Sequence, residues 1–271
     1  MNQDPPVFSP INLVVENQRV HARIGGDGPP VILLHSLLAD HSSFERIAGP
    51  LARTHRVIML TLPGFGTSDR VEGGLEAVAH RVAGAIESLG LAEHPVLLGN
   101  GYGGFLALHI ALRHPKMVRR LVLADCGAAF SEPGRAAFRN MSAAAKEKGL
   151  SAIADVAMRR LFSPEYQSAH PALIAERRQR FLAVDPQTFH QACAALATLD
   201  LRPELGSLHI PTLVLAGEYD EATPPAMSHE LAAGLPQAQL QILAGCAHVP
   251  QLQEPELFLS AVLPFIDAWR T

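Results

Sequence analysis

Short apolar runs alternate with amphipathic stretches along most of the chain. The mostly apolar runs are residues 31–35, 57–61, 96–99, 120–125, 212–217 and 239–243. Runs of this kind suit parallel strands that are covered on both faces. Between them, apolar residues recur at helical spacing over 43–53, 75–89, 103–114, 227–234 and 255–269. This alternation predicts a doubly wound parallel sheet with right-handed crossovers, which places the chain in the α/β class.

Two stretches depart from this alternation. Residues 11–16 and 19–24 have strand-like composition around Asn17–Gln18, which predicts an opening hairpin. Residues 130–205 contain no convincing strand. Their helical stretches are 134–148, 151–162, 171–184 and 187–198. The sequence therefore predicts a core domain made of residues 1–129 and 206–271, with a helical cap, or lid, inserted over 130–205.

Composition limits the class of partner. Charged residues make up 18% of the chain and hydrophobic residues 48%, a balance that excludes a disordered protein. The 22 Lys and Arg against 26 Asp and Glu give a net charge of −4, which argues against nucleic acid as a partner. No apolar run approaches the roughly 18 residues of a membrane span, and the first residues lack an export-signal pattern. We expect a cytoplasmic protein with a small-molecule substrate and no membrane partner.

The thiols and imidazoles show no metal-site spacing. Cys126, Cys193 and Cys246 are scattered, as expected of reduced thiols. His109 and His114 are five residues apart and would point to different faces of a helix. We expect neither a metal nor another cofactor.

Residues 97–104, LLGNGYGG, pass from a predicted strand through a glycine turn into a predicted helix. This segment resembles the nucleophile elbow of the α/β-hydrolase family, Gly-x-Ser-x-Gly. In the same frame, this chain has Gly99-Asn100-Gly101-Tyr102-Gly103. Glycine therefore stands at the position where the family carries its nucleophilic serine.

Two further residues match the family's catalytic order of nucleophile, acid and histidine. Asp220 follows a predicted strand where the family has its acid, and His248 precedes the last predicted helix where the family has its base. The resemblance implies that His248 and Asp220 form a catalytic pair next to Gly101. A carboxylate on one imidazole nitrogen fixes the tautomer that leaves the other nitrogen free to accept a proton.

The resemblance extends to the loop after the first parallel strand. His35-Ser36-Leu37 is similar to the family's His-Gly-x, which implies an oxyanion hole formed by the backbone N–H groups of Leu37 and Tyr102. His35, Ser36 and Asp125 are expected to support the site, with His35 orienting its loop and not acting as a base.

The resemblance covers essentially the whole chain. It implies the α/β-hydrolase fold, with a mostly parallel eight-stranded sheet, helices on both faces and a helical cap. Residues 63–69, PGFGTSD, look like the family's loop after its fourth strand. Within the family, the predicted cap and the C-terminal third, with residues 201–225, look most like the 3-oxoadipate enol-lactonases. Those enzymes open a small carboxylated lactone.

Glycine at position 101 removes the oxygen that would form an acyl-enzyme. The missing side chain predicts a water-sized space above Gly101, and a water there, activated by His248 and Asp220, would attack an ester or lactone directly. The other hypothesis for the same activity is a Ser-to-Gly variant of a serine hydrolase; the sequence does not distinguish a natural glycine from an engineered one. Ser36 and Cys126 are the other nucleophiles in neighbouring loops, and neither has the elbow's geometry.

Three alternatives remain open. The His–Asp pair suits non-hydrolytic base chemistry in a lyase, isomerase or cofactor-free oxygenase, and loss of the serine suits a catalytically silent ligand-binding protein. Gly99, Gly101 and Gly104, with Asp125 after them, also fit a dinucleotide-binding turn, although such a turn should follow the first strand and this one follows about the fifth.

The arginines of the predicted cap are candidates for binding a substrate carboxylate, although a solvated helix face is the favoured interpretation of their pattern. They are Arg159, Arg160, Arg177, Arg178 and Arg180.

Overall fold

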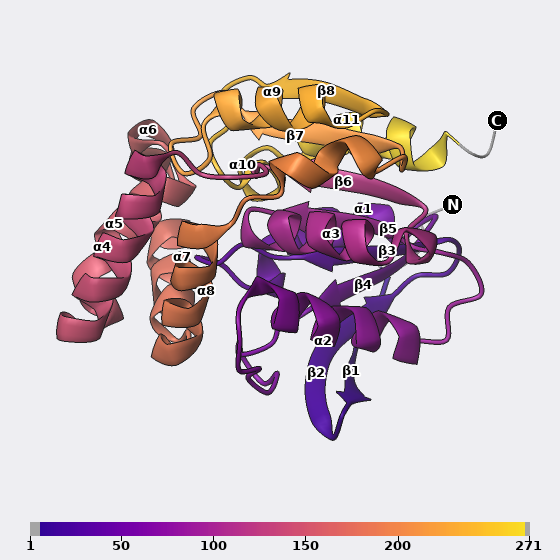
Figure 1. Ribbon diagram of the computed structural model, residues 1–271, viewed down its shortest axis with the longest axis horizontal. Coiled ribbons are helices and arrows are strands. Elements are labelled where there is room, and N and C mark those ends of the chain that lie inside the picture. The colour runs from indigo at the N-terminus through magenta and orange to yellow at the C-terminus, as the bar shows by residue number, and fades with distance from the viewer. Residues whose placement is uncertain (1–5, 269–271) are drawn as a thin grey trace.

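The computed structural model describes residues 6–268, and within that range it has one eight-stranded sheet in the order β1-β2-β4-β3-β5-β6-β7-β8 (Figure 1). The strands are β1 (Ser9–Val15), β2 (Gln18–Gly25), β3 (Pro30–Leu34), β4 (Arg56–Leu60), β5 (Val96–Asn100), β6 (Arg120–Ala124), β7 (Thr212–Gly217) and β8 (Ala238–Leu243). Strands β3 to β8 are parallel, and β1 and β2 pair antiparallel at one edge. The predicted α/β-hydrolase fold is confirmed.

The hairpin between β1 and β2 turns one residue earlier than the sequence predicts. Glu16 and Asn17, with φ of 50° and 63°, form the turn, and Gln18 already pairs with Val15. Positive φ at both central residues is typical of the tight turns that match the twist of two antiparallel strands.

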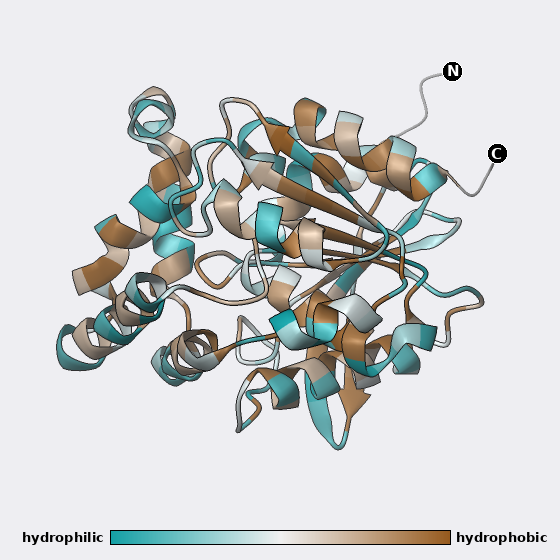
Figure 2. Cartoon of the chain, turned by 45° about the horizontal axis from the view of Figure 1, so that its top comes forward, coloured by the Kyte–Doolittle hydropathy of each residue, from teal (hydrophilic) through white to brown (hydrophobic). Residues whose placement is uncertain are grey.

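Helices cover both faces of the sheet (Figure 1). On one face lie α2 (Leu75–Ser88), α3 (Tyr102–Arg113) and α9 (Pro225–Gly234), and on the other α1 (Glu45–Leu51) and α11 (Pro255–Asp267). Alternate strand residues serve the two faces: Ile32 and Leu34 pack toward α2 and α3, whereas Val31 and Leu33 pack toward α1 and α11. The central strands are hydrophobic along their length, as Figure 2 shows.

The last strand, β8, is covered less than its sequence predicts. It ends the sheet order, so it has one neighbouring strand, and Gln239, Gln241 and Ile242 are exposed. The expectation that this strand is covered on both faces is wrong because an edge strand leaves part of its surface to solvent.

A group of helices, which we call the α4–α8 segment, connects β6 to β7 and lies beside one end of the sheet (Figure 1). It comprises α4 (Glu132–Lys148), α5 (Ala154–Leu161), α6 (Pro164–Ala169), α7 (Pro171–Leu182) and α8 (Pro186–Thr198). The predicted helical stretches did not include α6, although the sequence marks a helix start at Ser163-Pro164. The segment shares an apolar core with the sheet helices, for example where Phe130 contacts both Phe105 and Phe138. Its role as a separate cap domain stays a prediction.

Five short helical elements complete the described chain. They are η1 (His41–Phe44), η2 (Pro115–Met117), η3 (Leu150–Ile153), η4 (Arg202–Ser207) and α10 (Pro250–Gln253). None of the helices within residues 6–268 combines the length and apolar character needed to cross a lipid bilayer.

Candidate active site

The predicted elbow lies between β5 and α3. Gly101 has φ 53° and ψ −119°, a conformation that costs a residue with a Cβ about 1–3 kcal/mol. The N–H of Gly101 donates to the carbonyl of Ala124 at 2.9 Å, and the N–H of Gly103 donates to the carbonyl of His35 at 3.0 Å. These bonds join the turn to β6 and to the end of β3. Glycine therefore adopts the elbow's backbone without strain.

The predicted water-sized space lies beside Gly101 and not at its Cβ position. A Cβ on Gly101 would lie 2.6 Å from Ser36 Oγ and 2.7 Å from His248 Nε2, so these two side chains occupy the place of the missing one. A cavity of about 30 Å³ lies beside them. A water needs about 10–15 Å³, so this cavity has room for about two waters.

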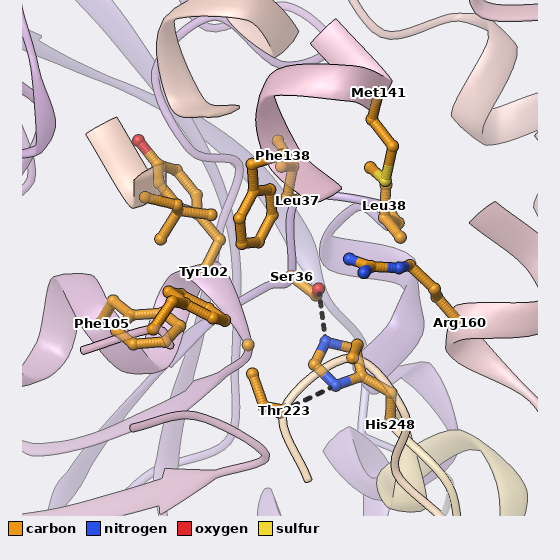
Figure 3. A pocket seen from close by; sticks show the side chains of 14 residues that line it. Ser36, Leu37, Leu38, Tyr102, Phe105, Phe138, Met141, Arg160, Thr223 and His248 are labelled. Atoms are coloured by element: carbon orange, nitrogen blue, oxygen red, sulfur yellow. Dashed lines mark hydrogen bonds between the residues drawn. The ribbon is translucent and has the colours of Figure 1, made fainter. Parts of the chain in front are cut away.

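The cavity is mainly apolar, with its polar groups gathered around His248 (Figure 3). Its walls come from the loop after β3, the elbow, α3, the loops after β7 and β8, and the α4–α8 segment. The lining residues are Ser36, Leu37, Leu38, Gly101, Tyr102, Phe105, Phe130, Phe138, Met141, Arg160, Leu196, Ala222, Thr223 and His248.

The structure brings His248 and Asp220 together. His248 Nδ1 lies 2.8 Å from Asp220 Oδ2, and the hydroxyl of Thr223 donates to the same oxygen at 2.6 Å. The N–H groups of Ala222 and Thr223 donate to Asp220 Oδ1 at 2.7 and 3.1 Å. Burial alone would raise the pKa of Asp220, but the His248 charge and these hydrogen bonds outweigh it and lower the pKa. An ionised Asp220 keeps the proton on Nδ1 and leaves Nε2 as an acceptor.

Ser36 is the hydrogen-bond partner of that acceptor. Its Oγ lies 3.3 Å from His248 Nε2, and Figure 3 shows the two side chains meeting at the cavity wall. The sequence interpretation placed Ser36 among the supporting residues. The structure instead places its hydroxyl at the end of the Asp220–His248 chain of hydrogen bonds.

The predicted oxyanion donors, Leu37 and Tyr102, both line the cavity. Tyr102 is the first residue of α3, so its N–H has no intrahelical acceptor. In the part of the chain that the structure describes, neither N–H donates to another protein group. Both are therefore available for an anionic oxygen, and their role in an oxyanion hole stays a prediction.

His35 is buried, and both ring nitrogens are occupied. Nδ1–H donates to the carbonyl of Ser36 at 2.9 Å, and Nε2 accepts from the N–H of Leu62 at 3.1 Å. Burial lowers the pKa of His35 to about 4. The ring is neutral and links the loop after β3 to Leu62; its orienting role stays a prediction.

Asp125, at the end of β6, has φ 51°, a strained conformation for a residue with a Cβ. Its Oδ1 accepts from the N–H of Gly217 at 2.7 Å, and the amide of Asn100 lies 3.4 Å from its Oδ2. Burial and then the charge of Asp220 raise the pKa of Asp125 well above its usual range. We infer that Asp125 is the protonated partner of the two carboxyl groups, which suits a supporting role behind Asp220.

Three polar residues that the sequence interpretation missed hold the histidine loop in place. The Asn100 side-chain amide donates to the His248 carbonyl at 2.9 Å, and Gln251 Nε2 donates to Asn100 Oδ1 at 3.1 Å. Gln253 Oε1 accepts from the N–H of Ala247 at 2.7 Å. An asparagine within the glycine elbow and two glutamines in the segment that follows His248 are the sequence signal that could have identified them.

The arginines of the α4–α8 segment are not all on a solvated face, so that expectation is wrong for two of them. Arg177 is buried and donates to Ser42 Oγ at 2.9 Å. Arg160 turns into the cavity, where its guanidinium carbon lies 5.7 Å from the centre of the Phe138 ring (Figure 3). Within residues 6–268, no carboxylate forms an ion pair with Arg160, whereas Arg180 pairs with Asp40 at 3.0 Å.

Cys126 does not line the cavity. It is fully buried, and burial, followed by the charges of Asp125 and Asp220, strongly raises the pKa of its thiol. A thiol held protonated in this way is a poor nucleophile.

Comparisons with known proteins agree with the fold. The family model described as "alpha/beta hydrolase fold" matches residues 29–255. Polyketide synthase ThaQ of Burkholderia thailandensis is 31% identical over 252 residues; the match covers 90% of this chain, and this chain spans only 12% of ThaQ.

Two solved structures are similar over nearly their whole length. A thermophilic esterase from Thermogutta terrifontis, with malate bound, is 27% identical with a TM-score of 0.88, covering 97% of this chain and 100% of that one. The enol-lactonase from Burkholderia xenovorans LB400 is 26% identical with a TM-score of 0.89, covering 94% and 99%.

Proposed function

Because the chain belongs to the α/β-hydrolase fold family, we propose that it hydrolyses small carboxylic esters or lactones, with His248 and Asp220 as the general base. The observation that carries this proposal is the 2.8 Å contact between His248 Nδ1 and Asp220 Oδ2 beside a cavity that His248 lines. The similarity to an esterase and an enol-lactonase supports hydrolysis as the reaction class.

In the proposed reaction, His248 Nε2 removes a proton from the group that attacks the carbonyl carbon of the substrate, either a water or a hydroxyl at the cavity wall. Asp220 stabilises the imidazolium that forms, as a buried carboxylate on the other ring nitrogen does in serine hydrolases. The N–H groups of Leu37 and Tyr102 stabilise the negative charge that develops on the carbonyl oxygen. His248 then returns the proton to the leaving alcohol.

We further propose that the preferred substrates carry a carboxylate. Among the described residues no carboxylate pairs with Arg160, whose guanidinium lies at the wall of a mainly apolar cavity. Guanidinium groups bind carboxylates with two parallel hydrogen bonds. The malate in the similar Thermogutta terrifontis esterase is also a carboxylate ligand, which supports this substrate class.

Gly101 favours a second candidate function. A His–Asp pair without an adjacent elbow serine also suits proton abstraction from a substrate carbon or oxygen without a covalent intermediate. An enolisable ketone or a hydroxy compound would then be the substrate, and no ester bond would be broken.

One activity panel tests both candidates. Lactones, esters and enolisable ketones are incubated with the chain as given, with Gly101→Ser and with His248→Ala, and the products are identified by mass spectrometry. We expect ester or lactone hydrolysis by the chain as given, and a loss of about 10³-fold or more in kcat/KM for His248→Ala.

The other outcomes separate the alternatives. A gain of several orders of magnitude in Gly101→Ser alone would support a Ser-to-Gly variant of a serine hydrolase. Conversion of ketones that depends on His248 would support base chemistry. Unchanged hydrolysis in His248→Ala would contradict the proposed function.

A further inference from the structure

We propose that Ser36 is the nucleophile of this site and is acylated during turnover. This inference rests on the proposed hydrolysis of esters or lactones and identifies the atom that attacks the substrate. Water then enters in the second half of the reaction, when it releases the acyl group from Ser36.

The hydroxyl of Ser36 takes the place of the side chain that position 101 lacks. Ser36 Oγ lies 3.3 Å from His248 Nε2 and would be 2.6 Å from a Cβ on Gly101. With Nδ1–H of the neutral ring facing Asp220 at 2.8 Å, Nε2 is the acceptor for the Ser36 hydroxyl. Asp220, His248 and Ser36 thus form a continuous acid–base–hydroxyl chain, which is the arrangement that activates a serine.

The main chain at Ser36 is held in place. Its carbonyl accepts from His35 Nδ1–H at 2.9 Å and from the N–H of Ala39 at 3.3 Å. Ser36 has 1% of its surface exposed, yet it lines the cavity. A hydroxyl carried by a main chain that is held in this way needs little reorganisation before it attacks a carbonyl carbon.

The N–H groups of Leu37 and Tyr102 suit a nucleophile at position 36 as well as one at position 101. In the elbow arrangement, the donors are the N–H of the residue after the nucleophile and an N–H from the loop after β3. With Ser36 as the nucleophile, Leu37 is the residue after it and Tyr102 is the donor from the opposite loop. Both residues line the same cavity, and the N-terminus of α3 favours negative charge there.

The reaction then has two steps. In the first, Ser36 Oγ forms a bond to the carbonyl carbon while its proton passes to His248 Nε2; the bond between that carbon and the alcohol oxygen breaks, and the alcohol takes the proton. In the second, a water gives a proton to Nε2 and attacks the acyl carbon. The bond from that carbon to Ser36 breaks, Ser36 Oγ regains the proton, and a carboxylic acid leaves.

Covalent labelling tests this assignment directly. Diisopropyl fluorophosphate replaces its fluoride with an activated serine oxygen, and mass spectrometry of the peptides locates the adduct. We expect one adduct, on Ser36, both in the chain as given and in the control variant Ser43→Ala. Ser43 suits a control because its hydroxyl is buried and has no hydrogen-bond partner among the described residues. We expect none in Ser36→Ala or His248→Ala.

Kinetics with p-nitrophenyl acetate provide the second readout. We expect Ser36→Ala to lose about 10³-fold or more in kcat/KM and Ser43→Ala to lose little. The double variant Ser36→Gly/Gly101→Ser clears the space that Ser36 fills and returns a serine to the elbow. It should regain activity and carry its adduct on the new serine, which also shows that loss in Ser36→Ala is not a folding defect.

Each outcome bears on one proposal or on both. Hydrolysis that needs His248 but continues in Ser36→Ala, without an adduct on Ser36, overturns the Ser36 assignment and keeps the proposed function. An adduct on Ser36 without hydrolysis of any ester or lactone supports an activated Ser36 and contradicts the proposed function. Neither adduct nor hydrolysis contradicts both.

Discussion

At the scale of single residues, His35 couples the geometry of the site to pH. Its neutral ring donates to the Ser36 carbonyl and accepts from the Leu62 N–H, so protonation would place a second N–H against that donor. With the pKa lowered to about 4, the folded state binds this proton less readily than the unfolded state does. The stability from the neutral ring is complete above the unfolded pKa of about 6.5 and is lost as the pH falls toward 4.

We therefore predict that His35 contributes about 3 kcal/mol to the loss of unfolding free energy between pH 7 and pH 4. Urea unfolding at both pH values, for the chain as given and for His35→Gln, measures this difference. His114→Gln, at an exposed position, is the control and should keep the full pH dependence. An equally steep dependence in His35→Gln would contradict the prediction.

At the scale of secondary-structure elements, α5 presents two neighbouring arginines to different surroundings. Arg160 lines the cavity, whereas Arg159 is exposed on the outer side of the same helix. Replacing Arg160 removes a guanidinium that we propose binds the substrate's carboxylate, and replacing Arg159 does not.

We predict that Arg160→Gln raises KM about 10- to 100-fold for an ester that carries a carboxylate and changes KM little for a neutral ester of the same size. Steady-state kinetics on the matched pair of esters, with Arg159→Gln as the control, test this expectation. Equal changes for both esters would point to a packing role for Arg160 next to Phe138.

Periodicity and motif order predicted most elements, yet they did not predict how side chains meet. The order of Gly101, Asp220 and His248 along the chain correctly brought these residues together because the carboxyl ends of neighbouring parallel strands share one edge of a sheet. The contact of the Ser36 hydroxyl with His248 depends on the side-chain rotamers of two residues in loops that are far apart in sequence. No local pattern contains that information, and the cavity wall formed by Arg160 depends on how α5 packs.

At the scale of the whole molecule, one carboxylate joins the α4–α8 segment to the sheet. Asp40, which precedes η1, accepts from Arg180 at 3.0 Å, lies 3.8 Å from Arg177, and accepts from the Ser42 N–H at 3.0 Å. Burial raises the pKa of Asp40, but the hydrogen bond from the Ser42 hydroxyl and the charge and hydrogen bond of Arg180 lower it overall, so the group is ionised at neutral pH. Arg177 is itself buried and depends on these partners.

We predict that Asp40→Asn lowers the unfolding free energy by about 1–3 kcal/mol and speeds proteolytic cleavage within α4–α8. Denaturant unfolding and limited proteolysis with mass mapping of the first cut check both parts. Glu132→Gln, which breaks an exposed ion pair within α4, is the control. Cleavage that begins elsewhere, or at an unchanged rate, would contradict this role for Asp40.

The main chain of the loop that carries His248 is held by residues other than the catalytic side chain itself. Asn100 holds residue 248 through its carbonyl, and Gln253 holds residue 247 through its N–H, so these two contacts fix the main chain of the loop without involving the imidazole. A different side chain at position 248 would start from the same backbone position and face the same cavity. The scaffold is thus suited to acquiring new reactions by exchange of single residues, with its architecture retained.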